Sequence, residues 1–275
     1  MVTNSLQSDI MVDDLASYLA RNNNLVFPHR QNFYHFVLFT NGSGTHTIDF
    51  ETFDIEPWQI YFMSPGQIHS WDFKKDMQGF VVNFHQDFFK NLLMRSDYLD
   101  NFPFFSGLVR DEVFGIEQNI QQKVSDLLTD IKNNITKLEF VRVSLLYLFH
   151  LLELQREPIV SQEINAYNHT LLRNFINLIE LNYKSLRLPK DYAALLYITP
   201  NHLNALCKER LGQSAGELIR NRIILEAKRL LVIKDYSVSE IAYTLSFNDN
   251  SYFTKFFKKI EGMTPEEFRK KQALK

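Results

Sequence analysis

Short hydrophobic segments separated by polar turns fill the first part of the chain. Between residues 25 and 84, aromatic and β-branched runs are divided by turns such as Asn41-Gly42 and Pro65-Gly66. This pattern is typical of antiparallel strands joined by tight turns. Strands so closely spaced favour a small barrel or sandwich. We predict strands over residues 33–40, 45–50, 58–63, 68–73 and 79–84.

After residue 86 the hydrophobic positions change to a helical period. Apolar residues at spacings of three and four predict helices over residues 114–135 and 140–154. Such a pair of amphipathic helices can cover a barrel, pair with the same helices of a second subunit, or do both. The polar and asparagine-rich residues 1–24 are expected to form a mobile arm or a short helix.

The last third of the chain repeats one plan twice: a short apolar helix, a tight turn and a second helix with its own N-cap. In the first copy Thr199 is a favourable N-cap and Gly212 a favourable helix end. In the second copy Ser237 and Glu240 have the spacing of a capping box, and Asp249 caps the helix that follows. The repeat predicts two helix-turn-helix units in tandem.

These patterns divide the chain into two domains. A long apolar helix over residues 215–233 joins the two helix-turn-helix units, so residues 169–275 form one all-helical domain. Residues 1–156 form a strand-rich sensor and dimerisation domain, and the polar residues 157–168 form a linker. The predicted fold class is α+β with two domains: a small β-barrel with flanking helices, followed by the helical domain.

Charge is distributed unevenly between the two domains. The formal net charge is −2, but residues 1–168 carry 12 Lys and Arg against 21 Asp and Glu, whereas residues 169–275 carry 18 against 11. An acidic part joined to a basic helix-turn-helix part is expected of a sensor attached to a DNA-binding module. The single cysteine, Cys207, excludes an internal disulfide. With neither a signal-peptide layout nor a membrane-spanning apolar run, we expect a cytoplasmic protein and no membrane partner.

The second half of the chain resembles the AraC/XylS family of bacterial transcription regulators. The stretch that resembles the C-terminal signature of that family is SVSEIAYTLSFNDNSYFTKFFKKIEGMTPEEFR, and TPNHLNALCKERLGQSAGELIRNRIILEAKRLL resembles its first helix-turn-helix and joining helix. The match covers roughly the last hundred residues. One departure is Ser246, which stands where the family usually has glycine. Serine tolerates positive φ less well than glycine, so we expect a strained or altered turn there.

The resemblance implies that the second helix of each unit binds double-stranded DNA. Asparagine can pair with adenine, lysine can approach guanine, and threonine or alanine can meet a thymine methyl group. The positions that match the family's DNA-contacting helices are Asn201, Asn204, Ala205 and Lys208 in the first unit and Asn250, Ser251, Thr254 and Lys255 in the second. For Lys208, and for Arg222, Lys228, Lys258 and Lys259, phosphate contacts and ordinary surface charges are equally good interpretations.

The first half resembles the cupin-like effector domain that many members of this family carry. The similar stretch is FYHFVLFTNGSGTHTIDFETFDIEPWQIYFMSPGQIHSW, in which Pro65-Gly66 and His69 follow a strand as they do in cupins. Metal-binding cupins have a His-x-His…Glu set, whereas this chain offers His29, Gln31 and His35. The resemblance therefore implies no metal ion, and we expect no cofactor.

A pocket at the mouth of a β-barrel is the usual place for a small-molecule ligand. Aromatic and imidazole side chains in the predicted strands are compatible with a sugar or with an aromatic acid, so the effector stays open. The candidate effector contacts are His35, His46, Trp58, Tyr61, His69 and Trp71.

The leading hypothesis is a DNA-binding transcription regulator, not an enzyme, that responds to a small molecule and works as a homodimer. RNA polymerase would be a further partner if the protein activates transcription. The alternative is a cupin-type metalloenzyme with a fused helix-turn-helix domain, which would need the missing metal ligands. A DNA-repair methyl acceptor is a third hypothesis, but it would need an activated cysteine, and Cys207 lies on the apolar face of a predicted helix.

Overall fold

The structure, a computed structural model, forms two compact units, Met1–Ile159 and Val160–Lys275. The predicted linker lies outside the described residues up to position 165, and its last three residues belong to helix α5, Ala166–Asn182. The structure describes residues 9–22, 29–74, 77–90, 92, 98–99, 102–105, 109–155, 166–233 and 236–273.

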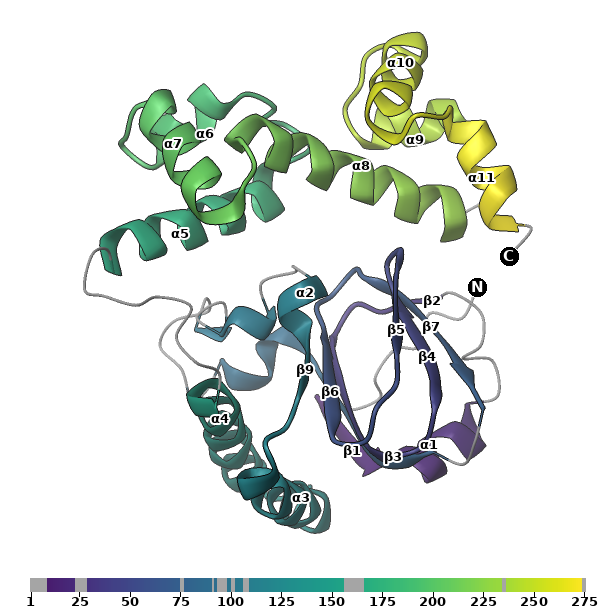
Figure 1. The fold of residues 1–275 in the computed structure, drawn as a ribbon, viewed down its shortest axis with the longest axis vertical. Coiled ribbons are helices and arrows are strands. Elements are labelled where there is room, and N and C mark those ends of the chain that lie inside the picture. Colours follow the sequence, from purple (N-terminus) through teal and green to yellow (C-terminus); the bar gives the residue numbers. More distant parts are fainter. Residues whose placement is uncertain are drawn as a thin grey trace. The chain divides into compact units, whose positions relative to one another are not determined.

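The N-terminal unit contains two antiparallel sheets that face one another (Figure 1). The five-stranded sheet has the order β1 (Ile10–Asp14), β8 (Gln78–Phe84), β3 (Tyr34–Asn41), β6 (Gln59–Met63) and β9 (Val113–Gly115). The four-stranded sheet has the order β2 (His29–Arg30), β7 (Ile68–Phe73), β4 (Gly44–Ile48) and β5 (Glu51–Asp54). The predicted α+β fold, with a cupin-like N-terminal domain, is confirmed.

Alternation along the strands of the larger sheet separates two buried clusters. Val37 and Tyr61 belong to the cluster between the sheets, whereas Phe36 and Phe62 belong to the cluster on the outer face. Helices α3 (Gln118–Asn133) and α4 (Leu138–Gln155) contribute their apolar residues to that outer cluster. The two predicted helices therefore exist and cover one sheet. The short elements η1 (Gln86–Phe89), η3 (Pro103–Phe105) and α2 (Val109–Glu112) lie between β8 and β9 in the chain.

Two expectations for the N-terminal unit are wrong in detail. Of the arm or short helix expected in residues 1–24, the short helix is present as α1, Leu15–Arg21, but residues 10–14 before it form β1. This strand pairs with β8 from Ile10 opposite Phe84 to Asp14 opposite Phe80. The predicted helix does not begin at residue 114, because Phe114 lies in β9 opposite Ile60 of β6. Both segments are strands because each one pairs with a strand that is distant in the sequence.

The C-terminal unit consists of the two predicted helix-turn-helix units on a central helix (Figure 1). Thr199 Oγ1 accepts the first-turn amide of His202 at 3.2 Å, and Ser237 and Glu240 form the predicted capping box. Asp249 caps the second helix of the second helix-turn-helix unit. The helices are α5, α6 (Pro189–Leu195), α7 (Pro200–Leu211), α8 (Ala215–Ile233), α9 (Val238–Thr244), α10 (Asn250–Glu261) and α11 (Pro265–Ala273).

The turn at Ser246 has the strained conformation that the sequence predicts. Ser246 has φ 56°, and Tyr197 has the same φ at the corresponding turn of the first unit. The Phe247 amide donates to the Ala242 carbonyl five residues earlier at 2.9 Å, which is the hydrogen bond of a Schellman helix end. In each helix-turn-helix unit, the turn therefore contains a non-glycine residue with a left-handed backbone conformation.

We expect Ser246→Gly to stabilise the C-terminal unit by about 1 kcal/mol, because glycine adopts positive φ without steric cost. Ser239→Gly, inside α9, is the matched control and is expected to destabilise the unit by about 0.5 kcal/mol. Urea unfolding followed by far-UV circular dichroism measures both changes. Equal unfolding free energies for Ser246→Gly and the parent chain would contradict a strained turn.

Candidate functional site

Helices α7 and α10 each bury one face and expose the other. The buried face of α7 contains Leu203, Leu206 and Cys207, and that of α10 contains Phe253 and Phe257. Of the eight predicted DNA-contacting residues, five are exposed and three are half-buried. The exposed residues are Asn201, Ala205, Lys208, Ser251 and Lys255; the half-buried ones are Asn204, Asn250 and Thr254.

Asn204 also has a structural role. Its Oδ1 accepts the backbone amide of Ala215 at 3.0 Å, so the side chain connects α7 to the first residue of α8. This bond satisfies one of the amides that the first turn of a helix leaves without an intrahelical partner. An asparagine held in this way presents a fixed amide group, and its remaining donors keep a defined direction.

The predicted phosphate contacts separate into two kinds. Arg222 Nε donates to the Glu180 carboxylate at 2.7 Å, and Lys228 Nζ lies 3.3 Å from the Glu261 carboxylate. Both side chains are therefore used within the unit. Lys258 and Lys259 are exposed on α10. Arg222 and Lys228 are therefore internal ion-pair partners, whereas both interpretations stay open for Lys258 and Lys259.

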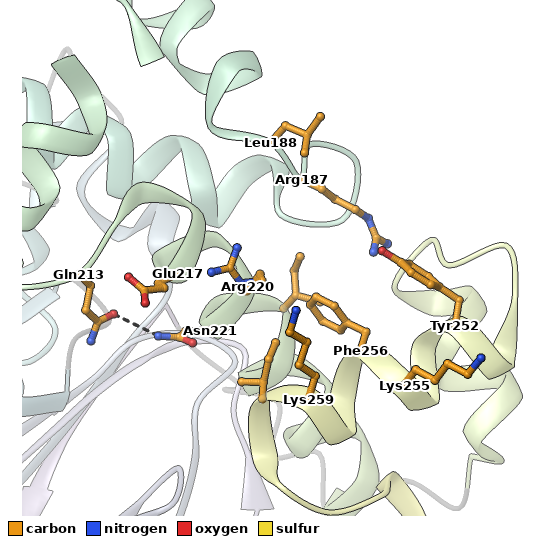
Figure 2. Close-up of a pocket in the computed structure, with 12 residues that line it drawn as sticks. Arg187, Leu188, Gln213, Glu217, Arg220, Asn221, Tyr252, Lys255, Phe256 and Lys259 are labelled. Carbon is orange, nitrogen blue, oxygen red and sulfur yellow. Dashed lines mark hydrogen bonds between the residues drawn. The ribbon is translucent and has the colours of Figure 1, made fainter. Parts of the chain in front are cut away.

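A cationic cleft of about 900 Å³ lies between α8, α10 and the segment before α6. Four basic side chains contribute to its lining: Arg187, Arg220, Lys255 and Lys259. In Figure 2 Arg220 and Lys259 point toward the same space, whereas Lys255 points outward from α10. Sequence reasoning missed Arg187 and Arg220, although the position of Arg220 on the polar face of α8 was a usable signal.

The one acidic residue among those that line the cleft has its charge engaged at a helix end. Glu217 Oε2 accepts from the Ser214 amide and the Ser214 hydroxyl, each at 2.7 Å, in a capping box at the start of α8. These bonds, with smaller contributions from Arg220 and Lys208, lower the pKa of Glu217. Lys208 of α7 contributes to the lower pKa of Glu217, but the residues that line the cleft come from α8, α10 and the segments before α6 and α8, and none comes from α7.

Cys207 has the environment of a core residue. It is buried, and burial raises the pKa of its thiol to about 12. A nucleophilic cysteine needs its thiolate form, which this environment opposes. The structure therefore disfavours a methyl-acceptor role for Cys207.

Five of the six predicted effector contacts lie together between the two sheets. His35, His46, Tyr61, His69 and Trp71 are all buried, with ring centroids of neighbouring members 4.7–5.9 Å apart. Trp58, the sixth, packs against the outer cluster instead, since alternation along β6 places it with Ile60 and Phe62, which belong to that cluster. The structure thus brings five candidates into one interior ring cluster and excludes one.

Polar atoms connect this interior ring cluster to its surroundings. His35 Nδ1 lies 2.5 Å from Asn83 Oδ1, and His46 Nε2 lies 3.4 Å from His69 Nδ1. Trp71 Nε1 is buried without a hydrogen-bond partner among the described residues. Burial, with smaller contributions from Glu56 and Asp54, raises the pKa of Tyr61, which therefore stays a neutral phenol. An interior of this kind offers a ligand stacking surfaces and hydrogen-bond donors. Within the described ranges, no three His, Cys, Asp or Glu side chains converge as metal ligands.

Two known protein families match this chain. Residues 14–139 match the AraC-like ligand binding domain, and residues 192–271 match a helix-turn-helix domain. The chain belongs to the AraC family of transcription regulators. The resemblance predicted from the motifs is confirmed in both halves. Among the residues that the structure describes, no helix is long and apolar enough to cross a membrane.

Relatives of this AraC-family chain are regulators. It is 31% identical over 165 residues to the uncharacterized transcriptional regulatory protein YesN of Bacillus subtilis, covering 58% of this chain and 43% of YesN. It is 28% identical to the uncharacterized regulator YtdP of the same organism, of which it spans 15%. It is 22% identical to the transcriptional activator RhaS of Escherichia fergusonii, covering 88% of this chain and 87% of RhaS.

Two solved structures are similar to parts or most of this chain. ToxT from Vibrio cholerae O395 is 15% identical, with 95% of this chain and 97% of ToxT covered and a TM-score of 0.48. The C-terminal domain of the response regulator yesN from Fusobacterium nucleatum is 27% identical, with 37% of this chain and 98% of that domain covered and a TM-score of 0.34.

Proposed function

We propose that this AraC-family protein binds double-stranded DNA sequence-specifically through α7 and α10 and regulates transcription in the cytoplasm. Two observations carry the proposal: the capped helices α7 and α10 expose their polar faces, and a cationic cleft lies beside α10. Helices of this kind fit the major groove of DNA. Basic side chains beside them can contact the phosphates of the DNA backbone. Arg220 and Lys259 are the proposed phosphate contacts, and Lys255, which points outward, is a proposed base contact.

Binding of this kind is expected to depend strongly on salt. If about six phosphates are neutralised, the logarithm of the affinity should fall against the logarithm of the salt concentration with a slope of about −5. Titrations of a fluorescent duplex at several salt concentrations measure the slope. A slope near zero would contradict the DNA-binding proposal.

Lys255→Ala is expected to relax base preference in one half of the binding site, at a cost of about 1–3 kcal/mol for the preferred sequence. Lys258→Ala is the matched control, because Lys258 is exposed on the same helix but does not line the cleft. A comparison of matched and mismatched duplexes separates base reading from charge. If Lys255→Ala weakens all sequences equally, Lys255 contacts a phosphate instead.

We also propose that the protein is a homodimer that pairs through α4. On this helix Phe140, Val143, Tyr147 and Leu154 are exposed, Val143 by 57% and Leu154 by 83%. Their spacings of three, four and seven place them in one stripe, which the half-buried Leu151 completes. A second copy of the same stripe is its natural cover, since two-fold pairing is the commonest assembly. RNA polymerase would be a further partner if the protein activates transcription.

For the N-terminal unit we propose small-molecule sensing by the interior ring cluster rather than enzymatic activity. The support is the match to a ligand-binding family and the convergence of five aromatic and imidazole rings on one interior. Trp71 lies inside that cluster, so an entering ligand is expected to change tryptophan fluorescence. Elemental analysis of the purified protein tests the rival metalloenzyme: stoichiometric iron, manganese or zinc that is lost in His69→Ala would favour it.

A further inference from the structure

Arg187 directly connects the two helix-turn-helix units. It lies between α5 and α6, in the first unit, and its Nη2 donates to the carbonyl oxygens of Leu245 at 2.6 Å and Ser246 at 3.0 Å. Those carbonyls are at the end of α9, in the second unit, 58 and 59 residues further along the chain. The guanidinium carbon also lies 3.7 Å from the centroid of the Phe247 ring.

Three features of this contact favour arginine. The last carbonyls of a helix lack intrahelical partners and carry the negative end of the helix dipole, so a cation there satisfies and stabilises them. The left-handed conformation of Ser246 turns successive carbonyls toward one donor group. A planar guanidinium can stack on an aromatic ring while donating in its own plane, which an ammonium group cannot do.

Among the described residues, the long helix α8 also joins the two helix-turn-helix units. Its first half is tied to the first unit by the Asn204–Ala215 bond and by the Arg222–Glu180 ion pair. Its second half is tied to the second unit by Lys228, which contacts Glu261 and the Phe268 ring. If α8 alone joined them, the two helix-turn-helix units could still move relative to each other by bending and twisting of that helix. Arg187 adds a second point of attachment away from the axis of α8.

We propose that Arg187 is a positioning residue that fixes the distance and angle between α7 and α10, and so selects the spacing between the two half-sites on DNA. The proposal rests on the proposed DNA-binding function. Two recognition helices on one face of DNA must be about 34–36 Å apart, and each added base pair shifts and rotates one half-site relative to the other. A rigid protein accepts one spacing, whereas a loosened one accepts several.

The test uses the full chain and a duplex that it selects from random sequences, remade with one or two base pairs added or removed between the half-sites. We expect the parent chain to lose at least about tenfold in affinity for each one-base-pair change. Arg187→Ala and Arg187→Lys should bind the original duplex about tenfold more weakly. When the half-site spacing changes by one base pair, the affinity of these two variants should fall by no more than about a further threefold. Lys190→Ala, an exposed cation in the first turn of α6, is the control and should keep the parent profile. If both Arg187 variants keep the parent's dependence of affinity on spacing, the proposal is overturned. In that case the substitution would only weaken binding to all duplexes by the same factor.

A distance measurement without DNA separates the failure of this inference from the failure of the proposed function. Cysteines introduced at the exposed positions Glu209 on α7 and Lys258 on α10 can carry spin labels, because buried Cys207, with its raised pKa, reacts slowly. We expect a narrow distance distribution in the parent chain and a broader one in Arg187→Ala. If no duplex is selected, the DNA-binding proposal fails and this distribution alone decides the positioning role. Equal widths would refute it.

Discussion

The Phe149→Ala variant is expected to lose about 3–5 kcal/mol of folding free energy in the N-terminal unit. Phe149 is fully buried on α4, and its ring centroid lies 5.2–6.3 Å from those of seven other described phenylalanines. These come from strands, 3₁₀ turns and the segment between them, so one side chain joins the helix layer to the sheet. The neighbours are Phe36, Phe62, Phe84, Phe89, Phe102, Phe104 and Phe105.

The positions of the tryptophans make this measurement selective. The chain has two, Trp58 and Trp71, and both are in the N-terminal unit, so urea unfolding followed by tryptophan fluorescence reports on that unit. Leu138→Ala is the control on the same helix, since Leu138 is 39% exposed and outside the proposed dimer stripe, and it should cost less than about 1 kcal/mol. Similar losses for the two variants would contradict the packing of α4 on the sheet.

The Val143→Glu variant is expected to be a monomer instead of the proposed dimer. Val143 belongs to the exposed stripe on α4, and an unpaired carboxylate buried between two copies would be strongly unfavourable. Affinity for a DNA site that binds two copies should fall at least tenfold, because the two half-complexes lose their connection. Analytical ultracentrifugation measures the mass.

Leu181→Glu provides the control for this substitution. Leu181 is 80% exposed on α5, in the other unit, so the same charge is added to an equally apolar site outside the stripe. That variant should keep the mass of the parent chain. A parent chain that is already monomeric at micromolar concentration, or a Val143→Glu variant that stays dimeric, would rule out pairing through α4.

The helical half could be predicted closely because its signals are local. Helix α8 has the predicted bounds, since apolar spacing, the preceding turn and the following Ser237 all lie within one stretch of sequence. The caps at Thr199 and Asp249 act on amides three residues away. Their chemistry is therefore visible in the sequence itself.

The elements that sequence reasoning missed depend on distant partners. Strand β1 is set by pairing with β8, and β9 by pairing with β6, neither of which a local pattern reveals. Trp58 was grouped with the interior rings, although alternation along β6 places it with Ile60 and Phe62 in the outer cluster. Arg187 gave no signal, because its partners follow 58 residues later. The other five rings were predicted only as aromatic and imidazole side chains of the strands, and alternation along those strands places them together in the interior.

The central claim, that α7 and α10 together read DNA, is tested most directly by selecting binding sites from a random duplex pool with the full chain. We expect an enriched site with two separate conserved blocks about one helical turn apart, which lie on one face of the duplex. Asn250→Ala and Lys255→Ala should change the bases of one block only, whereas Asn201→Ala should change those of the other. No enrichment, or a single block that neither set of variants alters, would contradict the claim.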